Sequence, residues 1–102
     1  MSDNRYINAA QQRVLLMLTM LAGHEVHGLL PSELAKALRT SNSNITRDLA
    51  NLKEAGLAEQ REETGGWALT PRMAHIAVTV LAAMNKAKTH LAEMEARYSR
   101  QR

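Results

Sequence analysis

The chain has 102 residues, of which 45% are hydrophobic, and it contains no cysteine. This length suits one domain with a modest core that a partner would supplement, and the absence of thiols excludes a disulfide framework and a thiolate metal site. The formal charge of +3 indicates a polyanionic partner only weakly, because residues 1–70 hold seven Lys and Arg against eight Asp and Glu, so that any nucleic-acid site there must be a local patch.

The first predicted helix covers residues 9–22, with Asn8 as its N-cap and Gly23 as its stop. Its apolar residues recur at helical spacing and are Val14, Leu15, Leu18, Leu21 and Ala22. The apolar run at 14–23 is about half the length needed to cross a bilayer, and LAG at 21–23 is a poor signal-peptide cleavage site. A cytoplasmic protein that does not enter a membrane is therefore expected.

A second, short helix is predicted after a loop at 24–30 that ends in a very short extended segment. Pro31 suits its first turn, and Leu34, Ala35 and Leu38 mark its buried face.

A third helix follows a break at 39–42, where Thr40 or Ser41 can cap it. Its buried stripe consists of Ile45, Leu49 and Leu52.

A two-stranded hairpin is predicted from segments 57–62 and 66–70, which flank a turn at 63–65. Leu57, Trp67 and Leu69 are expected to face the core, since core packing suits Trp67 better than base stacking. Thr70 followed by Pro71 then marks the start of a last helix.

That last helix is long, because nothing in residues 72–102 interrupts it with proline or glycine, and it should extend about 40 Å. Apolar residues occur along it at alternating spacings of three and four, the a/d pattern of a coiled coil. They are Ala77, Val80, Met84, Ala87, Leu91, Met94 and Tyr98. This stripe predicts a homodimer in which a second copy covers the helix, alone or in a bundle that includes the first helix. Parallel and antiparallel pairing remain open.

The order helix, short strand, helix, turn, helix, hairpin is that of a winged helix-turn-helix. The segments HGLLPSELAKAL, SNITRDLANLKEAGLAE and EETGGWALTPRMAHIA resemble the N-terminal DNA-binding domain of IclR-type transcriptional regulators, over residues 9 to about 77. The specific pieces are the S-x-[IV]-x-R-x-L-x-x-L run at 43–52 and the E-T-G wing turn followed by aromatic-x-Leu. The resemblance implies a mainly α fold with a small β-wing, a DNA-binding domain at 1–70 and a dimerisation helix at 71–102.

The sequence departs from that family in three ways. Leu30 stands where a threonine cap is frequent, and Gly66 stands where the wing commonly carries arginine, which puts minor-groove contact by the wing in doubt. The family's large effector-binding domain is absent from these 102 residues. No small-molecule effector is expected.

The predicted partner is double-stranded DNA, because a helix that enters the major groove presents its N-terminal side chains to base edges. Asparagine can pair with adenine, arginine with guanine, and hydroxyls with bases or phosphates. The candidates at the start of the third helix are Asn42, Ser43, Asn44, Thr46 and Arg47, and Asn51 is a further candidate one turn along the exposed face. The candidates for phosphate contacts are Lys36, Arg39, Lys53 and Arg61.

Other interpretations of these residues must be weighed. Ser41, Asn42 and Ser43 could serve only as turn and cap residues, and Arg39 and Arg61 could be ordinary surface charges. The whole domain could instead be a protein-interaction module, an adaptor or antirepressor without intrinsic DNA specificity, which the near-neutral charge of residues 1–70 favours.

Chemistry other than binding finds little support in the sequence. His24 and His27 have a spacing of three, but Glu25 is the sole carboxylate beside them, so no metal or other cofactor is expected. No nucleophile with a paired histidine and acid and no phosphate-binding glycine loop is present, so the protein is predicted not to be an enzyme.

Overall fold

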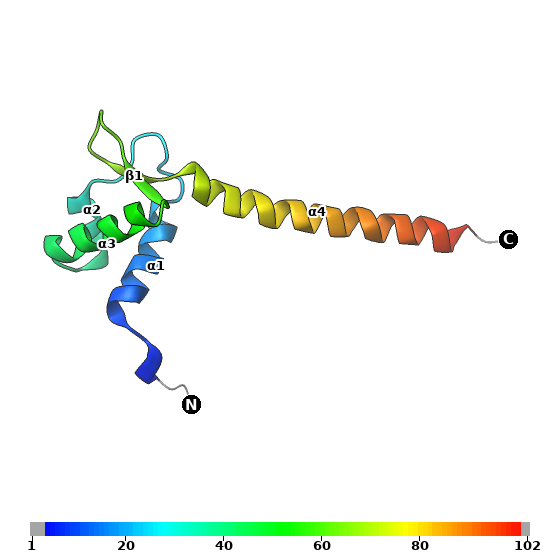
Figure 1. Ribbon diagram of the computed structural model, residues 1–102, viewed down its shortest axis with the longest axis horizontal. Helices are drawn as coiled ribbons and strands as arrows, with labels where there is room; N and C mark the ends of the chain where they lie inside the picture. The colour runs from blue at the N-terminus through cyan, green and yellow to red at the C-terminus, as the bar shows by residue number, and fades with distance from the viewer. Residues whose placement is uncertain (1–3, 101–102) are drawn as a thin grey trace.

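The computed structural model describes residues 4–100, which form a small domain with one long helix projecting from it (Figure 1). The elements in chain order are η1 (Asn4–Tyr6), α1 (Ala9–Leu21), α2 (Pro31–Leu38), α3 (Asn42–Glu54), β1 (Ala58–Gln60), β2 (Trp67–Leu69) and α4 (Pro71–Ser99). This order confirms the predicted fold class, a mainly α winged helix-turn-helix with a small β-wing and a long C-terminal helix.

Local side-chain chemistry starts the first three helices. Asn8 Oδ1 accepts the N–H of Gln11 at 3.0 Å, and Ser41 Oγ accepts the N–H of Asn44 at 3.1 Å, so both predicted caps are confirmed. Leu30 precedes α2 and has no side-chain acceptor; instead, the Glu33 carboxylate accepts the Leu30 N–H at 2.8 Å. That single bond and Pro31 at the first helical position replace the threonine cap.

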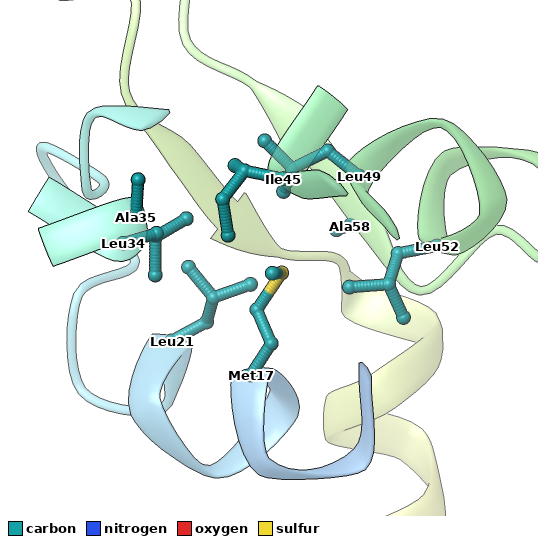
Figure 2. Close-up of a cluster of buried hydrophobic side chains, with 8 residues drawn as sticks. All are labelled: Met17, Leu21, Leu34, Ala35, Ile45, Leu49, Leu52 and Ala58. Atoms are coloured by element: carbon teal, nitrogen blue, oxygen red, sulfur yellow. The ribbon is translucent and has the colours of Figure 1, made fainter. Parts of the chain in front are cut away.

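The core lies where α1, α2, α3 and β1 converge, and the Met17 side chain points into the middle of it (Figure 2). The buried cluster comprises Met17, Leu21, Leu34, Ala35, Ile45, Leu49, Leu52 and Ala58. The predicted buried faces of α2 and α3 are confirmed, since Leu38 also packs against the cluster.

The predicted inner face of α1 was partly wrong. Leu15 is 56% exposed and Ala22 is exposed, whereas Met17 is fully buried. Because α1 carries apolar residues on almost all sides, helical spacing alone could not decide which side meets the core.

The wing is a short antiparallel hairpin in which Ala58 pairs with Leu69 and Gln60 with Trp67. Leu29, in the segment before α2, adds a bridge to Trp67, with N···O distances of 2.9 and 2.7 Å. Ala58 and Ala68 are fully buried in the hairpin. Leu57, Trp67 and Leu69 pack against the core as predicted, but each stays partly exposed.

Thr70 joins the end of α3, the hairpin and the start of α4 through two hydrogen bonds. The Thr70 N–H donates to the Leu57 carbonyl at 3.1 Å, and the Thr70 hydroxyl donates to the Gly56 carbonyl at 2.6 Å. Thr70 therefore occupies the predicted N-cap position, but its hydroxyl ties the end of α3 to the start of α4 instead of capping α4.

The long helix α4 has 29 residues, none of them buried, and Figure 1 shows it leaving the domain in a direction different from that of α1. The radius of gyration is 20.0 Å, whereas a compact domain of this length has about 13 Å. Among residues 4–100, no helix is both long enough and apolar enough to cross a membrane.

Candidate nucleic-acid interface

Helix α3 has two opposite faces. Ile45, Asp48, Leu49 and Leu52 are buried, and the other side exposes polar residues, most of them in the first half of the helix. The exposed polar residues are Asn42, Ser43, Thr46, Arg47 and Asn51. The structure thus brings five of the six predicted base-contacting residues onto the solvent side of one helix.

An ion pair that the sequence analysis missed holds α3 against α1. Arg13 Nε lies 2.5 Å from Asp48 Oδ2, and Arg13 Nη2 lies 3.1 Å from Asp48 Oδ1. The two side chains are 17% and 6% exposed, respectively. The hydrogen bond to Asp48 raises the pKa of Arg13, against a smaller opposing effect of desolvation, so the guanidinium is charged at neutral pH.

This two-bond pair fixes the rotation of α3 about its own axis, because a turned helix would carry Asp48 away from Arg13. A signal for it was present in the sequence. On a helical wheel Asp48 lies about 60° from Ile45 and about 40° beyond Leu52, at the edge of the apolar stripe, and a carboxylate buried there needs a cation.

Asn44 differs from the other predicted base contacts because it is half-buried. Its Nδ2 donates to Thr40 Oγ1 at 2.8 Å, and its Oδ1 lies 3.4 Å from Arg47 Nη1. Both ends of the amide are thus engaged within the domain. In this arrangement Asn44 links the turn before α3 to the Arg47 side chain.

The remaining polar residues of this face keep hydrogen-bonding capacity. Thr46 Oγ1 donates to the Asn42 carbonyl at 2.9 Å, and Asn51 Nδ2 donates to the Arg47 carbonyl at 2.8 Å. Each side-chain oxygen can still accept hydrogen bonds, and the Asn51 amide has a second proton. The surface is therefore able to read donors and acceptors on a partner.

Three of the four predicted phosphate contacts are exposed cations. Lys36 lies on α2, Arg39 follows its end in a left-handed conformation (φ 53°), and Lys53 is in the last turn of α3.

Arg61 is engaged within the domain. Its Nη1 lies 2.5 Å from Glu59 Oε2, while Nε and Nη2 donate to the Glu25 carbonyl at 3.0 and 2.5 Å. Arg61 therefore joins the loop before α2 to the wing, and a phosphate contact would have to break these bonds.

Close backbone packing between the same loop and the wing explains Gly66. A Cβ atom at Gly66 would lie 2.5 Å from the His27 carbonyl oxygen, and one at Gly28 would lie 2.5 Å from the Gly66 carbonyl carbon. Thr64 Oγ1 also donates to the His27 carbonyl, at 2.6 Å. The position where IclR-type wings commonly carry arginine is thus buried here and has no room for a side chain.

The tip of the wing is acidic, because Glu62 and Glu63 are exposed beside Thr64. These carboxylates would repel phosphates, so any attraction to a polyanion must come from cations outside the wing tip. Among residues 4–100, no cluster of three or more His, Cys, Asp or Glu side chains could hold a metal ion.

Comparisons with known proteins add little to this geometry. No protein-family model matches the chain, and no curated protein matches it. A solved structure described as a MarR family transcription regulator aligns with 95% of this chain and 77% of its own, at 23% identity and a TM-score of 0.47. That similarity is too low to carry an argument, and the winged helix-turn-helix assignment follows from the elements described above.

Proposed function

We propose that the protein is a sequence-specific DNA-binding transcription regulator that acts as a homodimer. Helix α3, with residues 42–55 as the recognition segment, would lie in the major groove, and the wing at 57–70 would lie beside it. The observation that supports this most strongly is the two-sided character of α3. One face packs on the core and is tied to α1 by the Asp48–Arg13 pair, while Ser43, Thr46, Arg47 and Asn51 are exposed on the other.

Each side chain of that face has a role that its chemistry suits. Arg47 would pair with guanine and Asn51 with adenine, while Ser43 and Thr46 would contact bases or phosphates. Asn44 would act by positioning Arg47, from its bond to Thr40. Asn42 remains a candidate contact at the start of the helix.

Affinity without sequence preference would come from three exposed cations, Lys36 on α2, Arg39 at its C-cap and Lys53 in the last turn of α3. Arg61 is left out of this set, because it already pairs with Glu59 and the Glu25 carbonyl.

The dimer would form through α4, whose a/d residues are Ala77, Val80, Met84, Ala87, Leu91, Met94 and Tyr98. None of these is buried within one chain. A twofold protein reads a twofold site, so the target is expected to be an inverted repeat with half-sites about one helical turn apart.

The test is selection from a randomised duplex pool at physiological salt, with Arg47→Ala and the matched control Arg100→Ala in parallel. Arg100 is an exposed arginine directly after the end of α4, and Figure 1 shows that end of α4 far from α3. We expect an inverted repeat for the wild type and the control, and an affinity loss of about 1–3 kcal/mol for Arg47→Ala with relaxed preference at one base pair per half-site. Wild-type protein that enriches no sequence would refute the proposal.

The acidic wing tip and the engaged Arg61 favour a second candidate, a winged-helix interaction module such as an adaptor or antirepressor. Such a module would retain duplex DNA weakly or not at all. A linear decrease of log affinity with log salt, with the slope of several phosphate contacts, would argue against it.

A further inference from the structure

The first half of α4 is apolar around most of its circumference. Residues 72–84 place their polar side chains, Arg72, His75 and Thr79, within a sector of about 60° on a helical wheel. The remaining sector exposes Ile76, Val78, Val80, Leu81 and Met84, each 47–60% accessible. A helix packed against one neighbour needs an apolar stripe of about 100°. This segment is therefore built to contact more than one neighbour.

The second half of α4 is different. In residues 85–99 the large apolar side chains Leu91, Met94 and Tyr98, with Ala87, fall within about 60° of the wheel, and charged, uncharged polar and alanine residues occupy the rest. Such a narrow stripe needs one neighbour. The change in width along one helix indicates that an additional element meets α4 near the domain and not at its far end.

Helix α1 has a matching unpaired surface. Leu15 and Leu16 are 56% and 53% exposed, and a groove runs along each side of Leu15. One groove, of about 650 Å³, is lined by Leu16, Leu38 and Thr19, with Arg13 and Arg39 also in its wall, and the other, of about 510 Å³, is lined by Ala10 and Val14, with Asp48 and Asn51 also in its wall. A ridge with a groove on each side is the surface that receives the side chains of another helix.

The accessible area agrees with a second copy as the occupant. The chain exposes 8059 Å², whereas a folded monomer of 11.3 kDa is expected to expose about 5,700 Å². The excess is about 2,300 Å² per chain, or about 4,600 Å² for two chains, which falls within the range of obligate homodimers.

We infer that the face of α1 formed by Leu15 and Leu16 is the seat of the partner's α4, so that the first half of each α4 lies between the partner's α4 and the partner's α1. This inference rests on the homodimer of the proposed function. Within one chain α1 and α4 diverge (Figure 1), so α1 cannot cover its own α4. If α1 paired with the partner's α1, part of the wide apolar sector in the first half of α4 would stay exposed to water. If α1 instead packs against the partner's α4, both that sector and the Leu15–Leu16 face are covered.

The experiment compares sedimentation equilibrium of the wild type with that of the double variant Leu15→Glu, Leu16→Glu. Val26→Glu is the matched control, since Val26 is 77% exposed in the loop before α2. We expect the wild type and the control to dimerise and the double variant to dissociate about 100-fold more readily, with unchanged helix content. A double variant that dimerises like the wild type overturns the α1 seat and leaves the homodimer intact. A wild type that is monomeric at tens of micromolar overturns the homodimer and the seat together.

A second measurement does not depend on disruption. The chain has no cysteine, so single cysteines introduce unique cross-linking sites. Leu16→Cys protein mixed with Leu81→Cys protein should form a mixed cross-linked dimer with a short bifunctional maleimide. Val26→Cys protein mixed with Leu81→Cys protein should not. Equal cross-linking in both mixtures would overturn the seat.

Discussion

Replacing Gly66 by alanine should destabilise the domain by steric overlap alone. Gly66 is not among the residues with positive φ, so alanine meets no conformational penalty there. Its Cβ atom would lie 2.5 Å from the His27 oxygen and 2.8 Å from the Gly28 carbonyl carbon, and both contacts are to backbone atoms. Since carbon contacts are ordinarily 3.5–4.0 Å, the loop and the wing must separate by about 1 Å.

The expected loss of folding free energy follows from the contacts that this separation breaks. Overpacking ordinarily costs about 1–3 kcal/mol. The two backbone hydrogen bonds between Leu29 and Trp67 bridge the same gap, and each contributes about 1 kcal/mol net. We therefore expect a loss of about 3 kcal/mol for Gly66→Ala, and a larger loss for Gly66→Arg, the residue that IclR-type wings commonly carry.

The assay is urea unfolding followed by the fluorescence of Trp67, the single tryptophan of the chain and the residue next to the substitution. Gly23→Ala is the matched control, because Gly23 has a φ of 95° and an added Cβ would meet nothing within 4 Å. It should cost about 1–2 kcal/mol through backbone conformation alone. If Gly66→Ala were as stable as the wild type, or less harmful than Gly23→Ala, the packing of loop against wing described above would be refuted.

Four further predictions concern α3 and its surroundings. Ser41→Ala removes the α3 N-cap and should cost about 1 kcal/mol in thermal unfolding; an unchanged melting temperature would contradict the role of its hydroxyl. Arg13→Met should lower the urea midpoint because it leaves the Asp48 carboxylate buried without a cation, and adding Asp48→Leu should recover most of the loss; a double variant less stable than the single one would be evidence against that explanation. Because the pKa of Arg13 is raised, the stability it contributes is present below the ordinary arginine pKa and is lost only as the pH rises through the raised value, so the difference between wild type and Arg13→Met should stay constant from neutral to mildly alkaline pH. Lys36→Ala should weaken all duplexes alike and reduce the salt slope by about 1.8, for two phosphate contacts per dimer; a change in sequence preference would instead place Lys36 at a base edge.

The helices and the hairpin could be predicted because their ends are chemically marked. Asn8 and Ser41 are caps, Pro31 and Pro71 open helices, and these signals are local in sequence. The stripe of α3 was also readable, since polar residues outside it leave one apolar side.

Contacts between distant elements could not be predicted from the sequence in the same way. Helix α1 is apolar on nearly all sides, so its burial of Met17 and exposure of Leu15 depend on where α2 and α3 pack. The sequence also gave no indication that Arg61 would bind the Glu25 carbonyl, 36 residues away, because such a contact exists only after the loop meets the wing. Whether the predicted DNA-contacting and dimerisation residues perform those roles stays a prediction for the experiments above.

The junction at Thr70 has a consequence for how such a protein can change over time. The chain leaves the end of α3 at Gly56 and Leu57 and returns to those same two residues at Thr70. The hairpin between them thus starts and finishes at one anchor, so the charge of its exposed tip residues Glu62 and Glu63 can change without altering the angle between α3 and α4. These tip carboxylates are the part of the wing that is free to vary, whereas Arg61, Thr64 and Gly66 are held by the loop before α2, and α3 and α4 keep a fixed geometry.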